Sequence, residues 1–211
     1  MKVVVFGATG GIGHPVVELA LKAGHSVVAV THGRPSDHAP HPKLQVTQGD
    51  VVATEAVAPL VAGADAVVLA LGVARPREPT TLFSEGARTV LSAMQHSGVR
   101  RLLAVSASGF VDSPDDRMAV RILFKPLLQR MLRPLYDDLK RMEAAVTASR
   151  SDWTLVRPAR LVDGPRTGVY RTCPGGLVPG GASIARADVA DFLVKRLEDP
   201  QSFGSAVGIA Y

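Results

Sequence analysis

Val3-Val-Val-Phe-Gly-Ala-Thr-Gly-Gly-Ile-Gly13 is the stretch that decides the fold of this chain. Its first four residues are apolar and predict a short strand that is buried on both faces. Glycines at a spacing of Gly-x-x-Gly-x-x-Gly follow at once and predict a tight turn. A pattern of helical period comes next, with apolar residues at Val16, Val17, Leu19, Ala20 and Ala23. Strand, glycine turn and helix in this order are typical of a dinucleotide site.

The turn residues are the first candidate ligands of such a site. One glycine allows the tight turn, another lets the backbone approach a pyrophosphate, and the last lets helix and strand pack closely. The phosphates would then meet backbone amides at the N-terminus of the helix. We therefore expect cofactor contacts from Gly7, Thr9, Gly10, Gly11, Ile12 and Gly13.

Further along the chain, short apolar runs alternate with stretches of helical period. The expected strands are Val3–Phe6, Val27–Val30, Leu44–Thr47, Ala66–Leu71, Leu102–Ser106 and Thr154–Arg157. The expected helices are Ile12–Ala23, Thr54–Val61, Glu85–Ser97 and Tyr136–Ser149. Alternation of this kind predicts βαβ units with right-handed crossovers. The fold class is thus α/β, a single Rossmann-type doubly wound parallel sheet with helices on both faces.

The length of 211 residues favours one domain. We expect residues 1–211 to form it, with a small substrate-binding portion built from the C-terminal loops. Ala187–Leu197 predicts one more helix, and Ala206–Ile209 a late edge strand. Two short helices rich in Leu, Met and Phe are expected at Arg117–Phe124 and Leu127–Leu132, as buried core or as a lid or contact surface.

The residues after the second predicted strand bear on the choice of cofactor. An NAD site has Asp or Glu there, which accepts a hydrogen bond from the ribose 2′-hydroxyl. This chain has Thr31-His-Gly-Arg34 instead. A guanidinium pairs with the 2′-phosphate that a carboxylate would repel. We therefore expect NADP(H), held by Arg34 together with His32; the alternative is an arginine that is merely solvated.

Two further turns are placed to contact the same cofactor. Asp50, followed by Val51, comes after the third strand, where its carboxylate can accept from the adenine amino group; its alternative role is to cap the helix near Thr54. Leu71 and Gly72 end the fourth strand, where backbone can approach the nicotinamide-side ribose and pyrophosphate. An ordinary glycine turn is the alternative there.

Composition excludes several classes of protein. Hydrophobic residues make up 46% and charged residues 20%, as in a globular protein with a buried sheet. The single cysteine, Cys173, cannot form an internal disulfide, which favours the cytoplasm. The N-terminal apolar run is too short for a signal peptide or a membrane span, so we expect no membrane association. The net charge of +5 is scattered with few aromatics nearby, which disfavours nucleic acid. We also expect no metal, and a monomer or small homo-oligomer.

Several segments together carry a resemblance that spans nearly the whole chain. They are Gly7–Gly13, Gly49–Val51, Pro79–Arg88, Arg157-Pro158 and Asp163–Tyr170. With them the chain resembles the atypical short-chain dehydrogenase/reductases, specifically the NADPH-dependent flavin reductases, also called biliverdin-IXβ reductases, and the NmrA-like proteins. The resemblance implies hydride transfer from the reduced nicotinamide to a flat conjugated acceptor. The expected partner is therefore a small molecule such as a flavin or quinone.

The same resemblance implies roles for residues after the fifth and sixth strands. Short-chain reductases place a hydroxyl beside the nicotinamide after the fifth strand, where this chain has Ser106 and Ser108. The flavin-reductase serine maps to Ala107, so we assign Ser108 to the substrate side and Ser106 to the cofactor side, although Ser106 could simply end the strand. Pro158 would shape the loop beside the nicotinamide amide. Arg160 replaces a family histidine and would bind an anionic acceptor.

Tyr136 and Lys140 have the Tyr-x-x-x-Lys spacing of ordinary short-chain reductases. One helical turn puts both on a single face, where the lysine would lower the tyrosine pKa for proton donation. A surface helix pair is the alternative.

The leading function is an NADPH-dependent reductase. The second candidate function is an NmrA-like redox sensor, which binds NADP(H) and a protein partner without turnover. A sugar-nucleotide epimerase is disfavoured because a long C-terminal substrate domain is lacking.

Overall fold

The sheet at the centre of the molecule has the predicted doubly wound topology. The structure, a computed structural model, describes residues 1–111 and 130–211. Its main strands are β1 (Lys2–Phe6), β2 (Ser26–Thr31), β3 (Leu44–Gln48), β4 (Ala66–Leu69), β5 (Arg101–Val105), β6 (Asp152–Pro158), β8 (Arg171–Pro174) and β10 (Ser205–Ala210). They are ordered β3-β2-β1-β4-β5-β6-β10-β8, and every neighbouring pair is parallel except β10 and β8. The predicted α/β fold class is confirmed.

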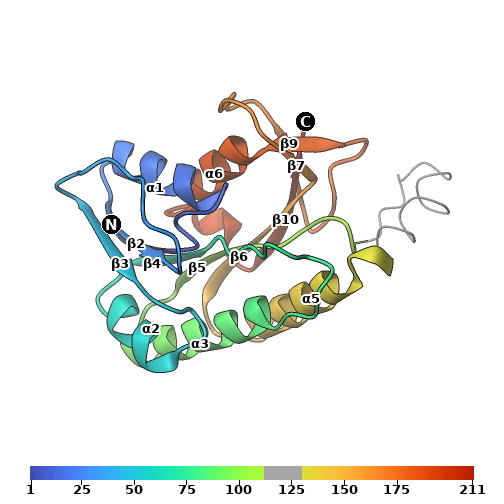
Figure 1. Ribbon diagram of the computed structural model, residues 1–211. Coiled ribbons are helices and arrows are strands. Elements are labelled where there is room, and N and C mark those ends of the chain that lie inside the picture. Colours follow the sequence, from blue (N-terminus) through green and yellow to red (C-terminus); the bar gives the residue numbers. More distant parts are fainter. Residues whose placement is uncertain (112–129) are drawn as a thin grey trace.

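Helices cover both faces of this sheet (Figure 1). They are α1 (Gly13–Lys22), α2 (Thr54–Val61), α3 (Leu82–Ser97), α5 (Arg133–Thr147) and α6 (Arg186–Lys195), with a short 3-10 turn, η2, at Pro200–Ser202. Figure 1 shows α1 and α6 on one face and α2, α3 and α5 on the other. A small separate pair, β7 (Arg160–Val162) and β9 (Ser183–Ala185), lies near the C-terminus.

The continuous apolarity of β1 follows from its position between two helix layers. Val3 and Val5 belong to the core cluster shared with α1 and α6, while Val4 and Phe6 belong to the cluster under α2, α3 and α5. Alternate residues of a strand point to opposite faces, so both sets must be apolar. All four are at most 1% exposed.

The order in which successive strands are added to the sheet reverses next to β1. β1 pairs with β2 on one side and with β4 on the other, so the loops after β1 and β4 diverge there. Gly7 follows β1 with φ +80°, and a Cβ on it would collide with the carbonyl group of Ala70. In doubly wound sheets the crevice at such a switch point is where ligands bind.

The C-terminal part of the sheet differs from the expectation. The strand expected at the edge is β10, which lies inside the sheet because β8 pairs antiparallel with it, from Val207 opposite Pro174 to Ala210 opposite Arg171. β7, β8 and β9 were not predicted, because three- and four-residue strands carry too little periodicity. The short helices expected around residues 117–132 fall largely on residues 112–129, outside the described residues.

No helix within the described ranges is both long and apolar enough to cross a membrane.

Candidate functional site

A pocket of about 900 Å³ opens at the switch point, at the carboxyl ends of β1, β2 and β4. This volume is near the top of the usual range for cofactor sites, roughly 300–1,000 Å³. The pocket wall contains these residues that the sequence had predicted as cofactor ligands: Gly7, Thr9, Gly10, Gly11, Ile12, His32, Arg34, Asp50, Val51, Leu71 and Gly72. Residues from four separate loops thus meet at one cavity.

The glycine turn presents backbone to this pocket. Gly10 N donates to Gly7 O at 2.9 Å, and no side chain caps the N-terminus of α1 at Ile12. The first amides of a helix lack intrahelical partners and attract anions. The turn therefore fits the diphosphate of a dinucleotide.

Gly13 has a different role from the other turn glycines. A Cβ on Gly13 would overlap the backbone of Gly7, whereas Gly13 itself is buried and does not line the pocket. It lets α1 approach the end of β1, which is the packing role that the glycine spacing predicted.

The segment after β2 brings a positive charge to one end of the pocket. Arg34 and His32 are both exposed and line the wall. His38, which the sequence analysis missed, anchors this segment: its Nε2 lies 3.2 Å from Ala8 O, and its ring stacks on His14 with centroids 4.2 Å apart. Burial, followed by the nearby His14, lowers the pKa of His38. Burial thus favours the neutral form of this ring, and no sequence pattern marks it.

Asp50 lies in the wall but is also used locally. Its Oδ1 accepts a hydrogen bond from Val52 N at 3.1 Å, which closes a turn before α2. The N-cap residue of α2 is Ala53, and no side chain caps this helix. Asp50 therefore shapes the turn and does not cap the helix, so its carboxylate is held at the pocket.

The backbone amides of the two serines after β5 are hydrogen-bonded to the end of β6. Ser106 N donates to Val156 O at 2.8 Å, and Ser108 N donates to Pro158 O at 3.1 Å. Ser106 Oγ is buried and has no hydrogen-bond partner among the described residues. A buried hydroxyl without a partner is costly, so this atom suits a polar group of a bound ligand. Neither serine nor Pro158 lines the 900 Å³ pocket itself.

The side chains of Arg160 and its neighbour Leu161 point in different directions. Leu161 lines the pocket, whereas Arg160 is exposed and does not. Successive residues of a strand point to opposite sides, and both belong to β7. Arg160 as an acceptor-binding residue stays a prediction.

Tyr136 and Lys140 come from α5, and the structure places both against Phe110. The Tyr136 and Phe110 rings have centroids 5.7 Å apart, and Lys140 Nζ lies 5.8 Å from the centroid of the Phe110 ring. The Tyr136 hydroxyl abuts Gly109, next to Ser108. Tyr136 is only 7% exposed, and burial raises its pKa, the opposite of the change that a catalytic lysine would cause. The dyad stays a prediction.

Several wall residues were missed by the sequence analysis, including Leu161 and two further sets. One comes from the start of α3 and the preceding loop: Pro79, Thr80, Thr81, Leu82 and Glu85. The distinctive block Pro79–Arg88 was the signal that could have found them. The other is Arg186, at the first position of α6, whose side chain crosses the turn at Gly11.

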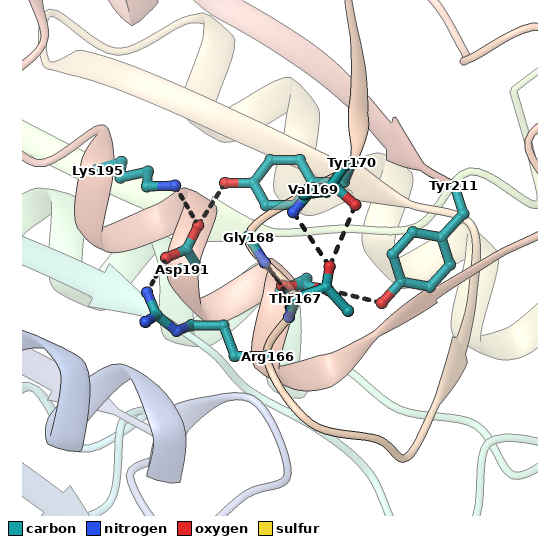
Figure 2. Close-up of polar contacts among 9 residues, drawn as sticks. Arg166, Thr167, Gly168, Val169, Tyr170, Asp191, Lys195 and Tyr211 are labelled. Atoms are coloured by element: carbon teal, nitrogen blue, oxygen red, sulfur yellow. Dashed lines mark hydrogen bonds and ion pairs between the residues drawn. The ribbon is translucent and has the colours of Figure 1, made fainter.

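Two carboxylates of α6 hold the loop after β7, which contains the distinctive block Asp163–Tyr170 (Figure 2). Asp188 accepts from Thr167 N at 2.9 Å, from Thr167 Oγ1 at 2.7 Å, from Gly168 N at 2.8 Å and from the Tyr211 hydroxyl at 2.6 Å. Burial opposes ionisation of Asp188, but these hydrogen bonds outweigh it and lower its pKa. The loop is thus fixed to the helix that begins with Arg186.

Asp191 fixes the same loop one turn further along α6. It accepts from the Tyr170 hydroxyl and from Arg166 Nη1, each at 2.8 Å, and pairs with Lys195 Nζ at 2.7 Å. Burial opposes its ionisation as well, and the donors again lower the pKa of the carboxyl.

Among the residues that the structure describes, no cluster of three His, Cys, Asp or Glu side chains could hold a metal ion.

Comparison with known proteins agrees with this geometry. A family model described as NAD(P)H-binding matches residues 7–200. The uncharacterized protein YwnB of Bacillus subtilis (strain 168) is 29% identical over 214 residues, covering 95% of this chain and 94% of YwnB. The 3-diazoavenalumate denitrifying reductase of a Streptomyces species is 31% identical over 159 residues, covering 63% of this chain and 51% of that protein.

Among solved structures, ChuY, an anaerobillin reductase from Escherichia coli O157:H7, superposes with a TM-score of 0.74. The two chains are 25% identical, and the match covers 100% of this chain and 97% of ChuY. The match with ChuY thus spans the residues that the sequence analysis used to infer a dinucleotide site.

Proposed function

Because the chain belongs to the NAD(P)H-binding family, we propose that it is an NADPH-dependent oxidoreductase that transfers hydride to a flavin, quinone or similar conjugated acceptor. The observation that carries the proposal is the pocket at the switch point, where the backbone of the glycine turn and the side chain of Arg34 line one cavity. The glycine turn offers backbone amides to a diphosphate, and Arg34 offers a cation to a 2′-phosphate.

The described residues fit each part of the cofactor. Gly10 and Gly11 would face the diphosphate, and Arg34 with His32 the 2′-phosphate. Asp50 would accept from the adenine. Ser106 Oγ, which lies outside the wall of this pocket and has no partner among the described residues, would receive a hydrogen bond from the nicotinamide end of the cofactor. When bound, the reduced nicotinamide supplies the hydride.

Hydride transfer leaves the protein with two tasks. Donor and acceptor must be stacked at near-attack distance, and the acceptor needs one proton along with the hydride. Ser108, which is partly exposed and bonded through its backbone to Pro158, would pass that proton from solvent. An atypical short-chain reductase that uses a serine in this way needs no activated tyrosine.

Two reductase relatives support the direction of the reaction. ChuY is named an anaerobillin reductase, and the Streptomyces relative a denitrifying reductase. Preference for NADP(H) over NAD(H) rests on Arg34 in the wall and on the lack of an acidic residue within Thr31-His-Gly-Arg34. A cytoplasmic location stays our prediction from the lone Cys173.

Turnover by the purified full chain tests the proposal. NADPH oxidation is followed by nicotinamide absorbance with FMN, riboflavin and small quinones in turn, against a blank without protein. We expect oxidation that depends on acceptor and saturates with NADPH. A Ser108→Ala variant should lose turnover while its NADPH affinity, measured by calorimetry, stays unchanged.

The second candidate function predicts a different result. The same pocket and the same Arg34 also suit an NmrA-like redox sensor, and the buried Tyr136 with Lys140 against Phe110 adds no prepared proton donor. A sensor would bind NADPH tightly and oxidise it with none of these acceptors. That outcome would overturn the reductase proposal and leave dinucleotide binding intact.

A further inference from the structure

Arg186 lies where no sequence pattern placed a cofactor ligand. A Cβ built on Gly11 would be 2.6 Å from Arg186 Cδ and 3.1 Å from its Nε. Gly11 belongs to the glycine turn, and both residues line the pocket. The side chain of Arg186 therefore runs across the turn that presents its amides to the pocket, and a side chain at position 11 would obstruct it.

The guanidinium of Arg186 is held but not neutralised. Its Nη1 donates to Asp163 Oδ1 at 2.6 Å, and no second carboxylate of the described residues pairs with it. The Asp163 side chain is 94% exposed. Exposed pairs of this kind contribute only about 0–1 kcal/mol, so the contact orients Arg186 without preventing it from binding another anion. A guanidinium has five N–H donors, and most of them stay available.

The loop that follows Asp163 is tied to α6 a few residues further along the chain. Thr167 and Gly168 of that loop are fixed to Asp188 of α6, and Arg166 to Asp191 of the same helix. Arg186 is the first residue of α6, so its backbone belongs to the helix to which this loop is tied. The fold thus fixes the backbone from which the Arg186 side chain reaches the glycine turn.

The pocket wall contains two arginines, at separate places. Arg34 follows β2 and Arg186 begins α6. NADP(H) carries two separate anionic groups, the 2′-phosphate and the diphosphate, whereas NAD(H) carries only the diphosphate. Since Arg34 is assigned to the 2′-phosphate, the remaining arginine lies at the turn where the diphosphate binds.

We propose that Arg186, oriented by Asp163, binds the cofactor diphosphate from the side opposite the amides of the glycine turn. This inference rests on the proposed function only in requiring a dinucleotide in the pocket. It assigns one arginine to each anionic group: Arg34 discriminates NADP from NAD, and Arg186 contributes equally to the affinity for both.

Calorimetric titration of the full chain tests this assignment with four probes: NADP⁺, NAD⁺, ADP-ribose and 2′-AMP. For Arg186→Gln we expect the affinity for NADP⁺, NAD⁺ and ADP-ribose to fall by one common factor, about tenfold to a hundredfold for a lost charge-assisted bond. The affinity for 2′-AMP, which lacks a diphosphate, should stay unchanged. Arg34→Gln should show the complementary pattern, with losses confined to NADP⁺ and 2′-AMP.

Controls separate this role from a loss of structure. Arg150→Gln removes the same charge from an exposed arginine and should leave all four affinities unchanged. Arg186→Lys keeps the charge without the planar fork and should retain part of the affinity for NAD⁺. Thermal melting establishes that each variant is folded.

Two results would overturn the inference in distinguishable ways. If Arg186→Gln binds NAD⁺ and ADP-ribose as tightly as the original chain, Arg186 is no diphosphate ligand, and the proposed function is untouched. If the original chain binds neither coenzyme, the proposed function fails, and this inference fails with it.

Discussion

Arg157 and Glu143 form a two-pronged ion pair that joins β6 to α5. Arg157 Nε lies 3.0 Å from Glu143 Oε1, and Arg157 Nη2 lies 2.6 Å from Oε2. The side chains are only 17% and 10% exposed, and the hydrogen bond from Arg157 to Glu143 raises the Arg157 pKa. The pair fixes the helix beneath the strand that ends at Pro158, beside the proposed nicotinamide end.

Removing one partner of this pair should destabilise the protein strongly. Arg157→Met leaves the Glu143 carboxylate largely buried without its cation, and the expected loss in the free energy of unfolding is about 3–5 kcal/mol. The double variant with Glu143→Leu should recover much of that loss, because both charges are then absent. Urea unfolding measures both, and equal losses in the single and double variants would contradict a specific pair.

Two alanine substitutions in the glycine turn should differ in their effect on stability. Gly13→Ala meets the backbone of Gly7, which cannot move aside, so we expect a loss of roughly 1–3 kcal/mol in the free energy of unfolding. Gly11→Ala meets only the side chain of Arg186, which can shift, so stability should change by no more than about 0.5 kcal/mol. Gly11→Ala should instead weaken NAD⁺ binding. Equal melting temperatures for the two variants would contradict this difference.

Arg34→Ala should alter the choice of coenzyme. Loss of a charge-assisted hydrogen bond to the 2′-phosphate costs about 1.5–3 kcal/mol, or about tenfold to a hundredfold in affinity. We expect that loss for NADPH and little change for NADH. Binding is measured by the fluorescence of each reduced coenzyme, and a similar loss for both would remove Arg34 from the 2′-phosphate site.

The dependence of the free energy of unfolding on pH should reveal the stabilising contribution of the Asp188 carboxylate. Its folded-state pKa lies below the ordinary value, so its contribution is fully present above the unfolded pKa of about 4 and is lost as pH falls through the folded pKa. Asp188→Asn should cost about 2 kcal/mol at neutral pH, since four hydrogen bonds reach the carboxylate. The gap between the variant and the original chain should narrow in acid below pH about 4. Unfolding curves across pH measure it, and a constant gap would argue against this origin.

Tyr136→Phe tests the tyrosine–lysine dyad directly. General acid catalysis contributes typically about 10²–10⁴-fold, so loss of an essential proton donor would be obvious. Because burial raises the Tyr136 pKa and Lys140 contacts Phe110, we expect turnover to stay within about threefold and its pH profile to keep its shape. A hundredfold fall in kcat with an altered alkaline limb would restore the dyad.

The candidate site was only partly predictable. The pocket-wall residues in the turns after β1, β2, β3 and β4 could be predicted because each follows a recognisable apolar strand, and parallel strands bring such turns to one edge. His38 and Leu161 were missed, because nothing local distinguishes a ring that anchors a loop or an apolar residue that lines a cavity.

The amino-acid sequence alone determined the strand, glycine turn and helix at the N-terminus, the alternation that makes a doubly wound sheet, and the cation after β2. These features depend on backbone conformation and periodic burial, which neighbouring residues encode. Only the tertiary structure decided that Arg186 crosses Gly11, that β10 lies inside the sheet, and that Asp188 and Asp191 fix the loop after β7. Those relationships join residues far apart in the chain, whose contact depends on how the helices and strands pack.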